Sequence, residues 1–318
     1  MPQHEDSKLE GRYLYSILIT LVVLIAEVIG GIWTGSLALL SDSGHVLTDV
    51  LALVISFSAY KMAQRPSDDN HTFGYHRLEV FAALFNGISL AIISIVIWWE
   101  AVHRFLVPNE ILGVPMMVIA VIGLIANILV ALVLKADHHS YSDHDHNIKH
   151  PHKSIDSKED INLYSAYMHV IGDAVSSVGV IIAGLAIWLT GVLWIDPLIS
   201  IFIGAMISVS SYRVLRRAFH ILLEGTPDGI SINEIVTAIS QIQGVSDIHD
   251  LHVWNICSGH VSLSAHVALT SKGCSNQVEI LSLIREMLLI SFSLEHVTIQ
   301  IESENCGQGN RALPNPVD

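Results

Sequence analysis

Apolar and polar positions divide the chain into six long apolar segments followed by a polar C-terminal region. The segments cover residues 13–33, 37–62, 80–103, 114–134, 161–189 and 195–214. Polar residues and turn formers separate them, for example "TGS" at 34–36 and "VPNE" at 107–110. A helix needs about 20 apolar residues to span the hydrocarbon core of a bilayer. We therefore predict a membrane protein with an all-α bundle of six transmembrane helices.

The C-terminal region predicts a small domain of mixed structure. Residues 231–243 and 275–291 have helical spacing, whereas "DIHDLHVWNI", "HVSLSAHVAL" and residues 295–303 have the pattern of strands. The order α-β-β-α-β fits an α+β domain whose sheet is covered on one side by helices. The predicted organisation is a tail at 1–12, the transmembrane bundle at 13–217, the α+β domain at 218–303 and a disordered tail at 304–318.

Composition supports the membrane assignment and narrows the partners. Hydrophobic residues make up 51% of the 318 positions and charged residues only 14%, with a mean hydropathy of +0.53. Soluble domains carry about a quarter charged residues. The net charge of −14 argues against nucleic-acid binding, which needs a basic face, and favours cationic partners. Cys257, Cys274 and Cys306 form no CxxC pair, which indicates reduced thiols in a cytosolic domain.

Basic residues predict the orientation in the membrane. The N-terminus lacks the basic start and cleavage site of a signal peptide, so we expect the first segment to remain as an anchor. With both termini cytoplasmic, twelve Lys and Arg lie near the inner membrane surface and only Arg104 lies in an outer loop. Because basic residues accumulate on the cytoplasmic side, both ends are predicted to be inside.

A histidine-rich loop lies between the fourth and fifth segments. Its sequence at 137–160, "DHHSYSDHDHNIKHPHKSIDSKED", holds six of the 18 histidines and few apolar residues. This composition is typical of a mobile cytoplasmic loop that associates loosely with metal ions. The alternative is a polar linker whose histidines are incidental.

Two apolar segments contain the same pair of ionisable residues at the same spacing. "HVLTD" places His45 and Asp49 four residues apart, and "HVIGD" does the same with His169 and Asp173. Residues i and i+4 lie on one face of a helix, about 6 Å apart along its axis. Ionisable groups cost at least a few kcal/mol in a membrane and normally face the bundle interior. Together the two pairs supply two nitrogen and two oxygen ligands, a tetrahedral set suited to Zn²⁺. The alternative is a structural His–Asp hydrogen bond in each segment.

Other polar residues of the apolar segments have simpler interpretations. Glu27 and Asn127 could line an ion path or bond to neighbouring helices, and the residues do not decide between these roles. Asp196 precedes Pro197 and indicates the start of a helix.

Several motifs in order along the chain resemble the cation diffusion facilitator family. They are "SLALLSDSGHVLTDVLALV", "DDNHTFGYHRLE", "AYMHVIGDAVSSVGVIIAG", "WIDPLISIFIGAMI", "LLEGTPDGIS" and "HDLHVW", and the resemblance covers about residues 12–303. Members of this family exchange cytoplasmic divalent cations for protons. The resemblance implies that His45, Asp49, His169 and Asp173 form the transport site. Histidine in both helices is associated in this family with a preference for zinc over cadmium.

The resemblance also implies a metal site in the loop between the second and third helices. Asp68 and His71 match the family's ligand positions, but the third position falls on Tyr75, and His76 is displaced by one residue. Whether Asp68, His71 and His76 hold a metal or only steer ions inward therefore stays open.

A third implied site lies in the C-terminal domain, which in this family has a metallochaperone-like fold, dimerises and binds zinc. His249, His266 and Glu302 match its ligand positions best, with His252 and His296 as nearby candidates. Strand alternation predicts that His249 and Trp254 lie on opposite faces of the sheet, so the histidines do not all face the core.

Together with the intramembrane quartet, the resemblance implies a homodimeric Zn²⁺/H⁺ antiporter that exports zinc by alternating access, with Zn²⁺ as both substrate and regulatory ligand. Histidine, with a pKa of about 6.5, allows protons to compete with the metal. Another main cargo (Cd²⁺, Co²⁺, Fe²⁺, Ni²⁺ or Mn²⁺) is the principal alternative. A metalloenzyme is disfavoured because no HExxH motif occurs and the quartet fills four positions. A membrane-anchored sensor would not need two intramembrane pairs. We expect a multi-pass protein of a bacterial plasma membrane.

Overall fold

Six long helices precede a small α+β region in the computed structural model. It describes residues 3–135, 156–257, 260–294 and 296–302, with side chains described from residue 18 to 129 and from residue 172 onward. The predicted tail at 304–318 and most of the histidine-rich loop lie outside these ranges. By its internal contacts the chain divides into two units, Met1–Ile55 with Phe85–Arg213 and Ser56–Leu84 with Val214–Asp318.

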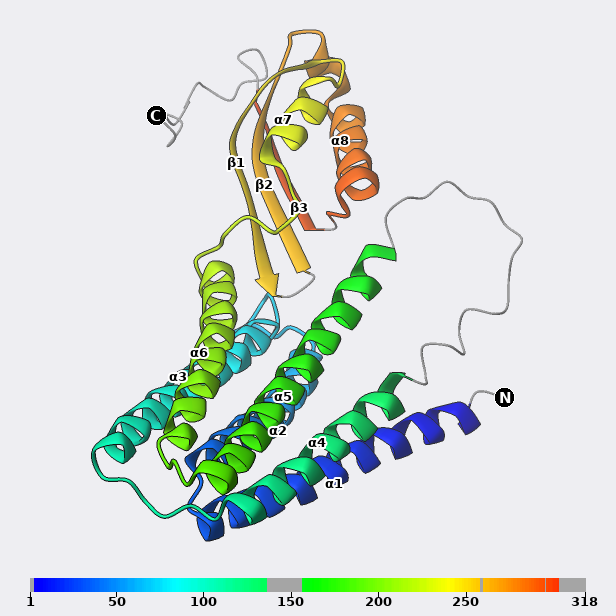
Figure 1. Cartoon of the computed structure of the whole chain (residues 1–318). Coiled ribbons are helices and arrows are strands. Elements are labelled where there is room, and N and C mark those ends of the chain that lie inside the picture. The colour runs from blue at the N-terminus through cyan, green and yellow to red at the C-terminus, as the bar shows by residue number, and fades with distance from the viewer. Residues whose placement is uncertain (1–2, 136–155, 258–259, 295, 303–318) are drawn as a thin grey trace. The chain divides into compact units, whose positions relative to one another are not determined.

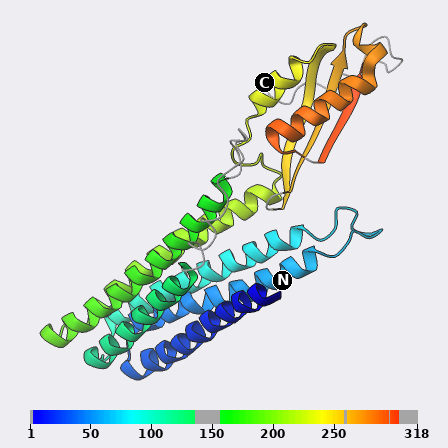
Figure 2. The same ribbon diagram turned by 90° about the vertical axis from the view of Figure 1, so that its right-hand side faces the viewer.

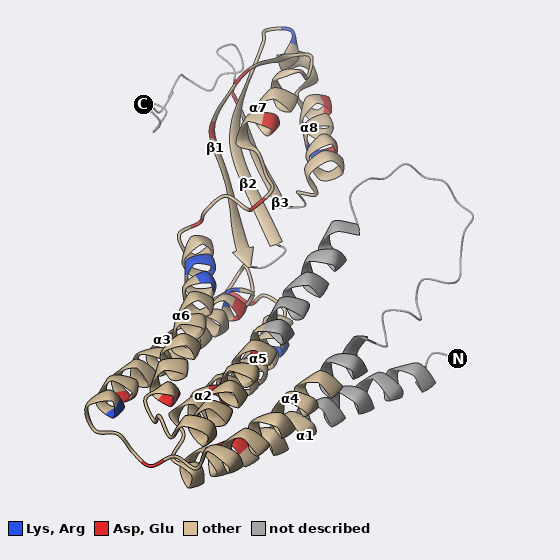
Figure 3. Cartoon of the chain, in the orientation of Figure 1, with Lys and Arg blue, Asp and Glu red and all other residues tan. Residues whose placement is uncertain are grey.

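The six helices follow the six predicted apolar segments. Their bounds are α1 Gln3–Thr34, α2 Leu37–Ala63, α3 Arg77–Leu106, α4 Gly113–Lys135, α5 Asp156–Thr190 and α6 Ile195–Leu222. The helices α2, α3, α5 and α6 are long and apolar enough over their described residues to cross a membrane, whereas the described apolar parts of α1 and α4 are shorter. Few charged residues interrupt them (Figure 3). Large apolar side chains such as Ile32, Phe57 and Trp99 are exposed, as expected where lipid replaces water.

Two of the helices begin earlier than their apolar segments. Helix α1 starts ten residues before Tyr13, and α5 starts within the histidine-rich sequence, whose residues 156–160 are helical. The polar ends of these helices satisfy their backbone hydrogen bonds without apolar side chains, so the apolar pattern marks the membrane segment and not the whole helix.

Small residues allow helices α4 and α5 to approach closely. A Cβ atom on Gly113 would lie 2.8 Å from the carbonyl oxygen of Gly184, and one on Gly184 would lie 2.9 Å from the carbonyl oxygen of Gly113. Glycine at both positions is therefore required by the crossing. Helix α1 runs beside α4 (Figure 1). The core of this unit is apolar and includes Leu39, Met116 and Ile203.

The C-terminal elements occur in the predicted order. They are α7 Ile232–Ser240, β1 Val245–Cys257, β2 His260–Leu269, a 3-10 turn at Gly273–Asn276, α8 Gln277–Phe292 and β3 His296–Glu302. Strand β2 is central, antiparallel to β1 and parallel to β3. Both helices cover the same face of the sheet (Figure 2), because Ile239 and Ile284 pack with Val253 and Leu263 in one core.

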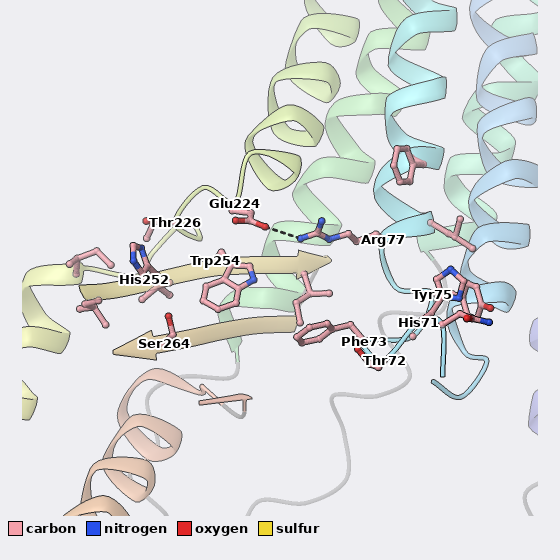
Figure 4. A pocket seen from close by; sticks show the side chains of 18 residues that line it. His71, Thr72, Phe73, Tyr75, Arg77, Glu224, Thr226, His252, Trp254 and Ser264 are labelled. Atoms are coloured by element: carbon pink, nitrogen blue, oxygen red, sulfur yellow. Dashed lines mark hydrogen bonds and ion pairs between the residues drawn. The ribbon is translucent and has the colours of Figure 1, made fainter. Parts of the chain in front are cut away.

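A β-bulge in β1 overturns the predicted placement of His249 and Trp254 on opposite faces. The register shifts between His249 and His252, where Asp250 has a φ of 52°. His249 is paired with His266, and Trp254 is paired with Ser262, four residues earlier on β2. The extra residue reverses the alternation of β1, so both side chains lie on the open face. Figure 4 shows the consequence, a pocket lined by His252, Trp254 and Ser264.

Candidate metal centres

Three of the four predicted transport ligands meet between helices α2 and α5. One ligand atom from each of His45, Asp49 and Asp173 lies within 4.8 Å of the others. His45 Nδ1 is 3.8 Å from Asp49 Oδ2, and His45 Nε2 is 3.4 Å from Asp173 Oδ1. Ligands of a tetrahedral zinc, bound at about 2.0–2.1 Å, lie about 3.3 Å apart. The side chain of His169 lies outside the described residues, but its backbone lies one helical turn before Asp173 in α5.

Asp42 joins the same two helices next to this cluster. It lies three residues before His45 in α2 and is buried. Its carboxylate accepts hydrogen bonds from the hydroxyl groups of Ser176 and Ser177 in α5, the second at 3.2 Å. Ser176 follows Asp173 by three residues, so these bonds hold the helices in register beside the ligands. Asp42 was not among the predicted site residues, although an acid three residues before His45 on the same helical face was a usable signal.

Asp196 stabilises the start of helix α2. It is fully buried, and its carboxylate accepts hydrogen bonds from the Ser36 hydroxyl at 2.6 Å, Leu37 N at 2.7 Å and Ala38 N at 3.2 Å. Asp196 lies in the first turn of α6, as the sequence indicated, yet it caps α2. These bonds satisfy amide groups that a helix start leaves without partners, and they fix the helix that carries His45.

Glu27 is a buried carboxylate in helix α1. Neither of its oxygens has a hydrogen-bond partner among the described residues. Gly123 of α4 faces it, and a Cβ atom there would collide with Glu27 Oε1. Burying a carboxyl group without hydrogen bonds costs free energy, and such groups in membrane helices often have a function, so Glu27 is a candidate for mutagenesis.

The loop between α2 and α3 brings only two of its three predicted ligands together. His71 Nδ1 lies 3.3 Å from Asp68 Oδ1, and the Tyr75 hydroxyl donates a 2.7 Å hydrogen bond to Asp68 Oδ2. The Tyr75 hydroxyl and the His71 amide lower the pKa of the Asp68 carboxyl, and the same contact raises the pKa of Tyr75. Tyrosine at this position thus occupies an oxygen that a metal would need. His76 belongs to another group of side chains, described below.

The C-terminal domain holds a second cluster on the open face of its sheet. His249, His266 and Glu302 come from β1, β2 and β3. Glu302 Oε1 lies 2.8 Å from His266 Nδ1, and Glu302 Oε2 lies 3.2 Å from His249 Nε2. Asp247 Oδ2 lies 3.2 Å from the other ring nitrogen of His249, where a carboxylate orients a metal-binding imidazole. His249 is paired directly with His266 in the β1–β2 ladder, and the bulge follows His249.

The other two histidines predicted for this domain are not members of this cluster. His252 is more than half exposed and lies 3.0 Å from Asp250, which in turn lies 3.6 Å from His266. His296 begins β3, six residues before Glu302, and its ring packs against Phe73 with centroids 5.7 Å apart. His252 therefore borders the cluster, whereas His296 lies about 20 Å along the strand from Glu302.

A third group was not predicted as a unit. His76, Cys257 and His260 each place a ligand atom within 4.8 Å of the others. Cys257 Sγ is 3.3 Å from His260 Nδ1, and the rings of His76 and His260 stack with centroids 4.6 Å apart. All three belong to the second unit.

Comparisons with known proteins agree over almost the whole chain. The model of the cation efflux transmembrane domain matches residues 13–223, and that of the cation efflux protein cytoplasmic domain matches residues 227–304. The cadmium, cobalt and zinc/H(+)-K(+) antiporter of Bacillus subtilis is 36% identical over 98% of this chain and 95% of its own. Zinc transporter ZitB of Yersinia pestis is 38% identical over 96% and 90%, and the metal cation efflux system protein CzcD of Cupriavidus metallidurans is 37% identical over 93% and 88%.

Proposed function

The chain belongs to the cation efflux, or cation diffusion facilitator, family, and from this premise we propose that it exports Zn²⁺ in exchange for protons. The predicted family, the helical membrane region and the small α+β domain are confirmed. The protein is thus an integral membrane transporter of metal cations. The zinc specificity, the proton coupling and the ligand set are the parts that we propose.

The observation that carries the proposal is the meeting of His45, Asp49 and Asp173 between two membrane helices. The side chains of His45, Asp49 and Asp173 are 15%, 25% and 18% exposed, so the cluster is partly buried and an ion can still reach it. His169 completes two imidazoles and two carboxylates. Two carboxylate charges match the charge of a divalent cation, which lowers the cost of holding the carboxylates in the membrane.

Proton exchange follows from the chemistry of these ligands. Zn²⁺ binds imidazole nitrogen and carboxylate oxygen only when both are deprotonated, so loading the site releases protons. When the bundle rocks to the outward-facing state, protons compete with the metal for the same imidazole and carboxylate groups. Protonation displaces the metal and resets the transporter. The bonds of Asp42 to α5 support a site that keeps its geometry during this cycle.

Cadmium or cobalt is the second candidate cargo, because the Bacillus subtilis relative is named for all three metals. Zinc is favoured because the described transport ligands are nitrogen and oxygen, and the larger, softer Cd²⁺ gains more from sulfur.

The described basic residues support termini on the cytoplasmic side. Lys61, Arg65 and Arg77 flank the α2–α3 connection, and Arg213 and Arg216 lie near the end of α6. Basic residues favour the inner surface, and bacterial relatives support a bacterial plasma membrane. In this arrangement the C-terminal domain is cytoplasmic, dimerises the protein and binds regulatory zinc at His249, His266 and Glu302.

The test is a flux assay on the purified protein in liposomes. A trapped zinc indicator and a pH-sensitive dye report both ions, with and without an imposed pH gradient. We expect zinc and protons to move in opposite directions, and Asp49→Ala to abolish both fluxes, whereas substitution of the exposed Asp228 by Ala leaves them intact. Zinc movement that is indifferent to the pH gradient would refute proton coupling, and an active Asp49→Ala protein would refute the site.

A further inference from the structure

We propose that His76, Cys257 and His260 form an additional binding site for a thiophilic divalent cation, and that Cd²⁺ and Zn²⁺ are the ions it binds. The site brings together His76, which precedes helix α3, Cys257 at the end of β1 and His260 at the start of β2. It shares no ligand with the intramembrane cluster or with the cluster at Glu302, so it does not depend on the proposed transport function.

The hairpin fixes two of the three ligands. Cys257 and His260 are paired residues at the end of the β1–β2 ladder, so their side chains emerge next to each other. Sγ and Nδ1 are 3.3 Å apart. A tetrahedral zinc with bonds of about 2.3 Å to sulfur and 2.0–2.1 Å to nitrogen separates these ligands by about 3.5 Å. The hairpin pair therefore needs little movement to bind.

His76 supplies the third ligand from another part of the unit. Its ring lies against His260, and one of its nitrogens is within 4.8 Å of both other ligand atoms. The surrounding structure holds this approach in place, because Cys257 is buried in an apolar cluster with Val80 and Ala218. Arg77 Nη2 also lies 3.3 Å from Glu224 Oε1 within the same unit (Figure 4). A cation at the three side chains would therefore bind a largely formed site.

The ligand set selects the metal. Two imidazoles and one thiolate leave a fourth tetrahedral position for water and favour Zn²⁺, Cd²⁺ or Co²⁺ over Mg²⁺ or Ca²⁺. Burial, followed by the nearby Glu79, raises the pKa of the Cys257 thiol. The cation must therefore displace a proton from sulfur, as coordinated thiols require. Among the clusters in the described part of the chain, this one alone offers sulfur, so Cd²⁺ is its most selective probe.

A purely structural contact is the competing explanation. Stacked imidazoles and a hydrogen bond between a thiol and a ring nitrogen would also place these side chains together. The two explanations differ in one measurable respect. Only a metal site produces a thiolate-to-metal charge-transfer band that depends on all three residues.

The experiment uses full-length protein in detergent, reduced and freed of metal. Cys274→Ser and Cys306→Ser are introduced first, so that Cys257 is the sole thiol. Titration with Cd²⁺, and separately with Co²⁺, is followed by ultraviolet and visible absorption. We expect one charge-transfer band whose amplitude corresponds to one metal-bound thiolate per chain, because the other two clusters bind metal without sulfur. Cys257→Ser should abolish this band, and His76→Ala or His260→Ala should weaken metal affinity at least 10-fold, the lower bound for outer partners of a metal site.

A matched control separates loss of the site from misfolding. His252→Ala removes an exposed histidine of the same domain and should leave the band and its affinity unchanged. Zinc flux of each variant in liposomes reports whether the protein is folded and tests transport independently of this site. A missing band in the parent protein would overturn the proposal. So would a band that survives Cys257→Ser, or one whose affinity ignores both histidine substitutions.

Discussion

Replacing Asp173 by asparagine should be the most informative single change at the proposed transport site. Asparagine keeps the shape of the side chain and one oxygen, but it removes the charge. Asp173 Oδ1 lies 3.4 Å from His45 Nε2 across the α2–α5 contact, so the substitution weakens the half of the site on α5 without opening a cavity.

The expected magnitude follows from the loss of one charged ligand at a partly buried site. Because His45 is neutral when it binds zinc, the substitution removes the attraction between the Asp173 carboxylate and the divalent cation. Part of this energy is offset, because a neutral amide loses less hydration and still offers a carbonyl oxygen. Removing one partner of a buried ion pair costs about 3–5 kcal/mol in proteins. A loss of about 3 kcal/mol corresponds to an affinity for zinc about 100-fold weaker.

The assay is zinc flux into liposomes as a function of zinc concentration under a fixed pH gradient. Asp173→Asn should shift the half-saturating concentration upward by about 100-fold or leave no measurable flux. The exposed Asp228 provides a matched substitution, Asp228→Asn, which should behave as the parent protein does. An Asp173→Asn transporter with an unchanged concentration dependence would contradict the shared site between α2 and α5.

Three further predictions test the other sites. Asp196→Ala leaves buried donors at the start of α2 without an acceptor and should destabilise the protein by about 3 kcal/mol. The measurement is the thermal unfolding midpoint in detergent, which should fall. An unchanged midpoint would refute the role of Asp196 as a helix cap. Glu302→Gln should weaken zinc binding by the C-terminal cluster at least 10-fold, as measured by calorimetry, whereas His252→Ala should have little effect. Equal effects of the two substitutions would show that the metal binds elsewhere. The folded-state pKa of Asp68 is lowered, so its contribution to stability is present above the unfolded pKa of about 3.9 and is lost as the pH falls. Tyr75→Phe removes the largest cause and should raise the pKa of Asp68 in a carboxyl NMR titration; an unmoved pKa would refute the contact.

The helices and their order were predictable because their signals are local. Six apolar segments near the length of a bilayer crossing predict six helices, and each segment lies within one of α1–α6. Alternation and helical spacing likewise gave α7, α8 and the three strands in order. What the apolar pattern did not predict was the polar extension of α1 and α5, because backbone hydrogen bonds form a helix without regard to the polarity of its side chains.

The proposed transport ligands form pairs that spacing alone predicts, since residues i and i+4 share one face of any helix. His45 and Asp49 needed no tertiary information to be paired. Their approach to Asp173 did, because it depends on the packing of α2 against α5, which Asp42 and its serine partners hold in register.

Local patterns in the sequence were sufficient to locate the helices and strands and the residues that carry metal-binding chemistry. Tertiary structure decided which of those residues meet. A single extra residue in β1 after His249 placed Trp254 on the same face as His249 against the simple alternation, since a bulge reverses every side chain after it. In the folded protein His76 groups with Cys257 and His260, which lie about 180 residues later in the sequence, and not with the nearby Asp68. Such contacts join segments distant in sequence, and no local pattern of polar and apolar positions encodes the distance between them.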